Sequence, residues 1–297
     1  MNSPGASEYS DGCFTRFKRR EPRYARLVTP AETDSGSSLV VWSRPAPGVS
    51  HLALNQPEHR NALTEELAQA LRSAVGQVAD DKTTRALILT GAGSAFCAGA
   101  DLGALGANAS DPAAKRRVLR DYYRAFLDLR DLAIPTIAAI AGPAIGAGLN
   151  LALCCDLRIV ADDARLAAPF LKLGIHPGGG ATWMLTQVVG PGAAREILLL
   201  GQPMDAQRAW QLGLASRVVP ADRLQGAALE WAVSLAALPA PVLGNLKRSL
   251  ALAEGGAGLA QVLDFETEAQ ADSLASEDAR EGWSALREHR EPHFHDR

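Results

Sequence analysis

Short apolar segments that alternate with amphipathic helical segments place the strongest constraint on how this chain can fold. Residues 86–89, 136–140 and 157–160 are too short for a helix and carry almost only apolar side chains. Residues 64–78 and 111–129, which precede the first and the second of these segments, carry apolar side chains at helical spacing. Each range begins with a helix-capping residue, Thr64 or Asp111. Strands that are apolar on both faces belong to parallel sheets covered by helices. We therefore expect an α/β fold.

The two ends of the chain differ from this pattern. Residues 1–37 are rich in Ser, Gly, Pro and charge without any period, which predicts a disordered or loosely attached extension. Two short strands, at 39–42 and 49–54, begin an α/β core domain that we place at residues 38–220. Residues 221–297 form a helical C-terminal region, which serves as a second subdomain or as an oligomer surface. Its expected helices cover residues 221–238, 242–254 and 259–274.

Composition excludes several classes of partner. The 297 residues are 47% hydrophobic and 21% charged, and the net charge is −3, so no excess of basic residues favours nucleic acid. The longest purely apolar runs fall far short of the roughly 20 residues that span a membrane. Four cysteines without a CxxC pair fit a reduced compartment, and we expect a cytoplasmic protein. We expect no bound metal, because the C-terminal histidines lie in a charged tail.

Two glycine-rich turns follow predicted strands, one at residues 89–102 and one at 140–148. Glycine at such a turn indicates that a ligand or another segment approaches the backbone closely. Neither turn fits the GxGxxG or GxxxxGK[ST] phosphate-binding motifs. Helix-to-strand packing without any ligand is the alternative explanation for either turn taken alone.

Taken together, the turns and several other motifs resemble the crotonase superfamily, the enoyl-CoA hydratase/isomerase family. The matching segments are Asn55-Gln56-Pro57, Arg60-Asn61-Ala62-Leu63, FCAGADL at 96–102, IAAIAGPAIGAGLNLALCCDLRIV at 137–160, GIHPGGG at 174–180, SEDAREG at 276–282 and REPHF at 290–294. They keep their order and spacing over residues 38–294. The resemblance implies the crotonase (ClpP/crotonase-like) fold of repeated ββα units. In relatives the helical C-terminal region packs across subunits, so we expect a homotrimer or a dimer of trimers.

The resemblance also implies a site for a CoA thioester with an oxyanion hole of two backbone N–H groups, here those of Ala100 and Ala147. Such donors stabilise the enolate charge that develops on a thioester oxygen. Coenzyme A would be part of the substrate, and no separate cofactor is expected. The remaining substrate-binding candidates are Ala62, Ala98, Gly99, Asp101, Leu102, Gly146 and Phe170.

Two positions depart from the family pattern. The hydratases place glutamates where this chain has Asn150 and Phe170, and the isomerases place their base at the second of these. An amide does not exchange a proton near neutral pH and a phenyl ring cannot hold water, so true hydratase activity is doubtful. Asn150 can still orient a water or a substrate carboxylate.

Two other side chains are candidates for acid–base chemistry. His176, with a pKa of about 6.5 in water, either acts on the substrate or bonds to the turn that follows it. Asp101 either takes part in catalysis or braces its loop by accepting backbone N–H bonds.

We therefore expect an enzyme that acts on an acyl- or enoyl-CoA thioester in fatty-acid or acyl-CoA metabolism. Decarboxylation or hydrolysis of a CoA thioester is an alternative that needs no pair of glutamates. A non-catalytic acyl-CoA binding protein is a further alternative from a different class.

Overall fold

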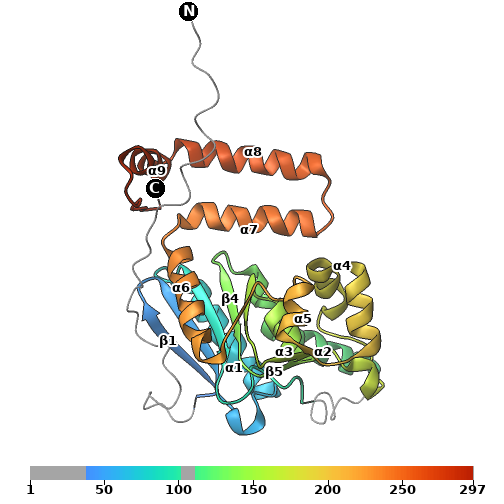
Figure 1. The fold of residues 1–297 in the computed structure, drawn as a ribbon. Coiled ribbons are helices and arrows are strands. Elements are labelled where there is room, and N and C mark those ends of the chain that lie inside the picture. The colour runs from blue at the N-terminus through green and yellow to red at the C-terminus, as the bar shows by residue number, and fades with distance from the viewer. Residues whose placement is uncertain (1–37, 102–110, 297) are drawn as a thin grey trace, which may run out of the picture.

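The computed structural model describes residues 38–101 and 111–296 (Figure 1). The predicted extension at residues 1–37 and the candidate Leu102 lie outside this range. Predictions about them therefore stay predictions, as does the division of the chain at residue 220.

The main sheet has six strands in the order β1-β2-β3-β4-β6-β9. These strands are β1 (Val40–Ala46), β2 (Val49–Leu54), β3 (Ala86–Gly91), β4 (Thr136–Ile140), β6 (Leu157–Ala161) and β9 (Arg217–Val219). The β1–β2 hairpin is antiparallel and every other pair is parallel. Strands β2 and β4 are buried along their whole length, as expected for strands covered on both faces. The α/β prediction is confirmed.

A second sheet contains three very short strands, β5 (Pro143–Ile145), β7 (Arg165–Ala167) and β8 (Met204–Asp205). Two sequence predictions are wrong here. The sequence predicts only a turn leading into a helix at residues 142–148, where the structure has β5, and after residue 180 it predicts a strand at 217–219 but none at the position of β8. Strands of two or three residues are too short to show a period of two, and they exist only because their partners align them.

Helices cover both sheets. They are α1 (Glu65–Asp80), α2 (Pro112–Leu127), α3 (Ala147–Leu153), α4 (Ala181–Leu200), α5 (Ala206–Gln211) and α6 (Leu224–Ala236), with short 3-10 helices η2 (Pro57–His59), η3 (Asp128–Asp131), η4 (Phe170–Leu173) and η5 (Ala221–Arg223). The predicted start of α1 is confirmed, because Thr64 accepts a hydrogen bond from Leu67 N at 3.2 Å. Asp111 caps α2 in the same way. Helix α1 packs on β1 and β2, and α6 packs on β3, β4 and β6.

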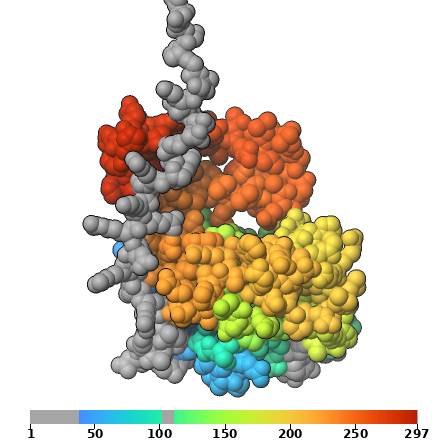
Figure 2. All heavy atoms as spheres, viewed as in Figure 1, coloured from blue at the N-terminus to red at the C-terminus, as the bar shows by residue number. Residues whose placement is uncertain are grey.

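The C-terminal helices α7 (Ala240–Glu254), α8 (Leu259–Ala275) and α9 (Glu277–Glu288) form a lobe above the core, coloured deep orange to red in Figures 1 and 2. Lys247 of α7 ties the lobe to the core by an ion pair with Asp156 at 2.8 Å. Asp296 of the C-terminal tail pairs with Arg85 and accepts a hydrogen bond from Ala240 N at 2.8 Å.

No single helix in the described ranges is long and apolar enough to cross a membrane. One pair of consecutive helical segments is long and apolar enough when the two are taken together, although they are bent by 106° from one another. The pair is Ala221–Ala236 and Ala240–Glu254.

Candidate active site

The structure brings the two glycine-rich loops together at the carboxyl ends of β3 and β4. Cys97 of the first loop forms a parallel bridge with Ala144 of β5, and Ile145 N donates to Cys97 O at 3.0 Å. Gly99 has a φ of 109°, and a Cβ built on it would lie 2.8 Å from Ile145 O and 3.9 Å from Ala147 N. Only glycine adopts this conformation without strain, so the backbone at Gly99 can lie beside Ala147 N.

Both predicted oxyanion donors have N–H groups without a backbone acceptor among residues 38–101 and 111–296. Ala147 is the first residue of α3, where no preceding turn of helix can accept its N–H. Around Ala100 the neighbouring backbone is held in place, since Leu63 N donates to Gly99 O at 2.7 Å and Asp101 N donates to Leu63 O at 3.3 Å. Neither N–H group therefore has a backbone partner among the described residues, and each is available to bind an oxygen atom.

Two more glycines set how closely the walls of this site approach. A Cβ on Gly148 would overlap the carbonyl oxygen of Cys97, so α3 can lie against the first loop only without a side chain there. Gly146 has a φ of 54°, and a Cβ on it would meet the Phe170 ring at 4.0 Å. Phe170 is therefore an apolar wall beside the second loop. Ala62 and Ala98 are partly buried, and Ala98 N donates to Arg60 O at 3.0 Å.

Asn150 lies three residues after Ala147, on the same face of α3. It is 2% exposed, and its amide nitrogen donates to Gly178 O at 2.9 Å. One amide hydrogen therefore holds the Gly178–Gly179 turn in place. The predicted role in orienting a water or a carboxylate stays a prediction.

His176 is exposed, and its Nδ1 lies 2.7 Å from Pro177 O. A carbonyl oxygen only accepts, so Nδ1 carries the hydrogen and Nε2 is the free acceptor of the neutral ring. This is the turn-bonded arrangement that was the alternative to catalysis. Asp101 is exposed at the end of the first loop.

Asn61 is a site residue that the sequence analysis missed. It is fully buried with a φ of 54°, and its side chain accepts from Gln56 N at 2.9 Å. Its amide donates to Ala92 O at 2.9 Å and to Ala95 O at 2.8 Å, which ties the start of the first glycine-rich loop to the core. Asparagine tolerates a left-handed backbone better than most residues, and its place in the Arg60–Leu63 motif was the available signal.

Two tyrosines of α2 were also missed as site residues. Tyr122 is buried and donates from its hydroxyl to Leu63 O at 2.9 Å, beside the first donor loop. Tyr123 is partly buried and its hydroxyl lies against Gly178. Burial raises the pKa of both phenols, so both stay protonated at neutral pH.

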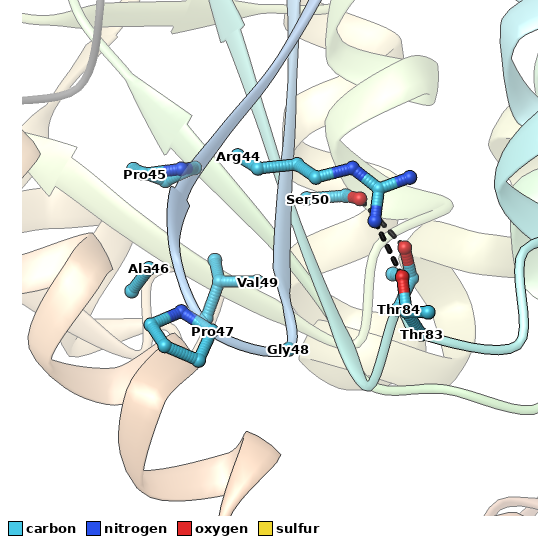
Figure 3. A pocket seen from close by; sticks show the side chains of 9 residues that line it. All are labelled: Arg44, Pro45, Ala46, Pro47, Gly48, Val49, Ser50, Thr83 and Thr84. Atoms are coloured by element: carbon cyan, nitrogen blue, oxygen red, sulfur yellow. Dashed lines mark hydrogen bonds between the residues drawn. The ribbon is translucent and has the colours of Figure 1, made fainter.

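Two cavities lie away from this site. One, of about 460 Å³, opens beside the β1–β2 turn near the start of β3, where Ser50 and Thr84 form a hydrogen bond of 2.7 Å (Figure 3). The other, of about 370 Å³, lies among α7, α8 and α9. Ligands of parallel sheets bind at the carboxyl ends of the strands, and neither cavity is there. The described residues hold no group of three or more His, Cys, Asp or Glu that fits a metal ion.

Comparison with known proteins agrees with this α/β fold. The family profile described as enoyl-CoA hydratase/isomerase matches residues 45–297. The chain is 50% identical over 195 residues to the probable enoyl-CoA hydratase EchA14 of Mycobacterium tuberculosis, covering 66% of this chain and 75% of that protein. It is 38% identical over 249 residues to the 1,2-epoxyphenylacetyl-CoA isomerase of Escherichia coli, covering 83% and 95%.

Among solved structures, the enoyl-CoA hydratase of Bacillus anthracis superposes with a TM-score of 0.82 at 31% identity, covering 87% of this chain and all of that one. The chain therefore belongs to the enoyl-CoA hydratase/isomerase family of enzymes. The family and the crotonase fold predicted from the sequence motifs are both confirmed.

Proposed function

We propose that this enzyme acts on an acyl- or enoyl-CoA thioester and that the N–H groups of Ala100 and Ala147 form its oxyanion hole. The observation that carries the proposal is the position of Gly99, whose backbone lies beside Ala147 N while both neighbouring N–H groups lack a backbone acceptor in the described chain. The names of the relatives, two enoyl-CoA hydratases and a 1,2-epoxyphenylacetyl-CoA isomerase, support the same substrate class.

The thioester oxygen would accept hydrogen bonds from both N–H groups. Because the donors are fixed before the substrate arrives, they stabilise enolate charge without reorganising during the reaction. Coenzyme A enters as part of the substrate, and the proposed chemistry uses no separate cofactor or metal.

The side chains at positions 150 and 170 decide which reaction follows. One hydrogen of the Asn150 amide bonds to Gly178 O, and Phe170 presents a ring beside Gly146. Neither can carry a proton, so the water addition that uses two carboxylates has no groups to perform it. This favours, as a second candidate, decarboxylation or hydrolysis of a thioester, in which the oxyanion hole stabilises the intermediate.

The test is incubation with a panel of enoyl-, malonyl- and β-ketoacyl-CoA thioesters, followed by mass spectrometry and calorimetry. Consumption of a thioester supports the proposal and identifies the reaction. Thermal stabilisation by CoA thioesters without consumption of any would indicate the binding-protein alternative. No heat and no thermal shift at millimolar thioester would refute a CoA-thioester site.

The same proposal includes assembly into a trimer or a dimer of trimers in the cytoplasm. The C-terminal lobe supports assembly, since α8 buries none of its residues within this chain. Large apolar side chains on the lobe are exposed, among them Val242, Leu246, Leu250, Leu259, Leu263, Leu274 and Trp283. Light scattering after gel filtration tests it, and a monomer at micromolar concentration would refute it.

A further inference from the structure

The Gly178–Gly179 turn lies between two helices that meet at the proposed thioester site. From α3, the amide of Asn150 donates to Gly178 O at 2.9 Å. From α2, the Tyr123 hydroxyl lies so close to Gly178 that any Cβ on this glycine would overlap it. A Cβ on Gly179 would lie 3.0 Å from the Asn150 amide nitrogen and 3.3 Å from the Tyr123 ring. The two side chains therefore flank one glycine turn.

The turn contacts α3 at Asn150, one helical turn beyond Ala147, and this places it near the expected acyl chain. Asn150 follows Ala147 by three residues, which is about 4.5 Å along a helix axis and on the same face. If Ala147 N–H holds the thioester carbonyl, as proposed above, the next two carbons of the acyl chain would lie within reach of Asn150 and of the side chains beside it.

The Tyr123 hydroxyl is available to a ligand. Within the part of the chain that the structure describes, it makes no hydrogen bond, and it is not fully enclosed. Its ring is fixed by Tyr122 and Phe126, with centroids 6.0 and 6.1 Å away. A donor on a fixed ring loses little conformational freedom when it binds an acceptor.

Three other protic side chains in the described part of this region already have a partner within the protein. The His176 ring donates to Pro177 O at 2.7 Å, and the Tyr122 hydroxyl donates to Leu63 O at 2.9 Å. The thiol of Cys154 is buried beside the sulfur of Met184. Phe170, on another wall, offers no hydrogen bond at all.

We propose that Tyr123 is a specificity-determining residue that donates a hydrogen bond to an oxygen atom on the acyl chain, close to its third carbon. The preferred substrates are then CoA thioesters whose acyl group carries a hydroxyl, carbonyl or carboxylate there, in preference to plain saturated chains. This inference rests on the proposed CoA-thioester function and adds the chemical class of the acyl group.

The experiment compares binding of butyryl-CoA and 3-hydroxybutyryl-CoA, which differ by one oxygen atom, by calorimetric titration. Wild type should bind 3-hydroxybutyryl-CoA more tightly, by about 2- to 12-fold for one net hydrogen bond. Tyr123→Phe keeps the ring and should remove that preference while leaving butyryl-CoA affinity within about twofold.

Tyr122→Phe is the matched control, because it removes a hydroxyl from the neighbouring residue of the same helix. Its hydroxyl bonds to the protein, so its loss should change both affinities by the same factor. Equal affinities of wild type for the two thioesters, or a Tyr123→Phe variant that keeps the preference, would overturn this inference while leaving the thioester site intact. If neither thioester binds to wild type, the proposed function fails as well.

Discussion

Acidification should destabilise this enzyme through one buried histidine before its carboxylates titrate. His51 lies in β2 and is 3% exposed. Its Nδ1 is 3.1 Å from Ser43 Oγ, and its Nε2 is 2.8 Å from Thr90 Oγ1. Burial lowers the pKa of His51 from 6.5 to about 4, so the folded protein holds the ring neutral. Thr90 lies at the start of the first glycine-rich turn, residues 89–102.

The sign of the effect follows from the two pKa values. The unfolded chain takes up the proton near pH 6.5 and the folded chain only near pH 4, so the unfolded state binds more protons between them. The contribution of His51 to stability is therefore complete above pH 6.5 and is lost as the pH falls toward 4. The full loss in the free energy of unfolding is about 3 kcal/mol, and about 2 kcal/mol of it occurs by pH 5.

The assay is denaturant unfolding of wild type and His51→Gln at pH 8 and pH 5, at one protein concentration because assembly affects apparent stability. Glutamine keeps a donor and an acceptor but does not titrate. Between pH 8 and pH 5 the free energy of unfolding should therefore fall by about 2 kcal/mol more in the wild type than in the variant. Asp81 and Glu281, with pKa values lowered to about 2 by hydrogen bonds from Thr84 and Arg290, lose their contributions below about pH 4.5. Equal losses in the two proteins, or a His51 imidazole resonance titrating near 6.5 in the folded state, would refute the reasoning.

Three further predictions concern the site itself. Ala147→Pro should lower turnover of any thioester substrate about 10²- to 10³-fold, because it removes an N–H donor at a helix position that tolerates proline, whereas Ala147→Gly should stay active; equal steady-state rates for wild type and the proline variant would remove Ala147 from the oxyanion hole. Gly99→Ala should cost about 1–3 kcal/mol of unfolding free energy in denaturant titration, because φ is 109° and the new Cβ would lie 2.8 Å from Ile145 O; an unchanged midpoint would contradict this. Asn150→Glu combined with Phe170→Glu should raise the rate of crotonyl-CoA hydration, which is measured as loss of the enoyl-thioester absorbance. A wild-type turnover of about 10–10³ per second would show that the assignment of these positions is wrong.

Structural features that depend on residues close together in the sequence could be predicted from the sequence. Thr64 and Asp111 cap α1 and α2 because each side chain reaches an N–H three residues ahead. Helix α4 was missed because it is apolar on most sides and bends at Gly190, so it shows no amphipathic period. The strands of the second sheet were missed for a different reason: their pairing partners are distant in the chain.

The same distinction applies to the site. The glycine-rich loops were identifiable because glycine at a turn has a local cause. Asn61, in contrast, acts through bonds to Ala92 and Ala95, which are 31 and 34 residues further along. Tyr123 lies on the same helix as the buried residues Tyr122 and Phe126, and only the position of the Gly178 turn, which is distant in the sequence, makes its hydroxyl a candidate for the site.

The backbone and the side chains of this site determine different parts of its function. Glycines at 99, 146 and 148 let the two loops approach closely, and the proposed donors in these loops are the backbone N–H groups of Ala100 and Ala147 rather than side chains. We therefore expect both N–H groups to be kept when the side chains at positions 150 and 170 change, because these positions lie outside the two loops. Because proton transfer depends on side chains while charge stabilisation depends on the backbone, a chain can keep the thioester chemistry of the family and change the reaction. Substitutions at positions 150 and 170 should accordingly change which reaction occurs, whereas substitutions at the glycines should abolish every reaction.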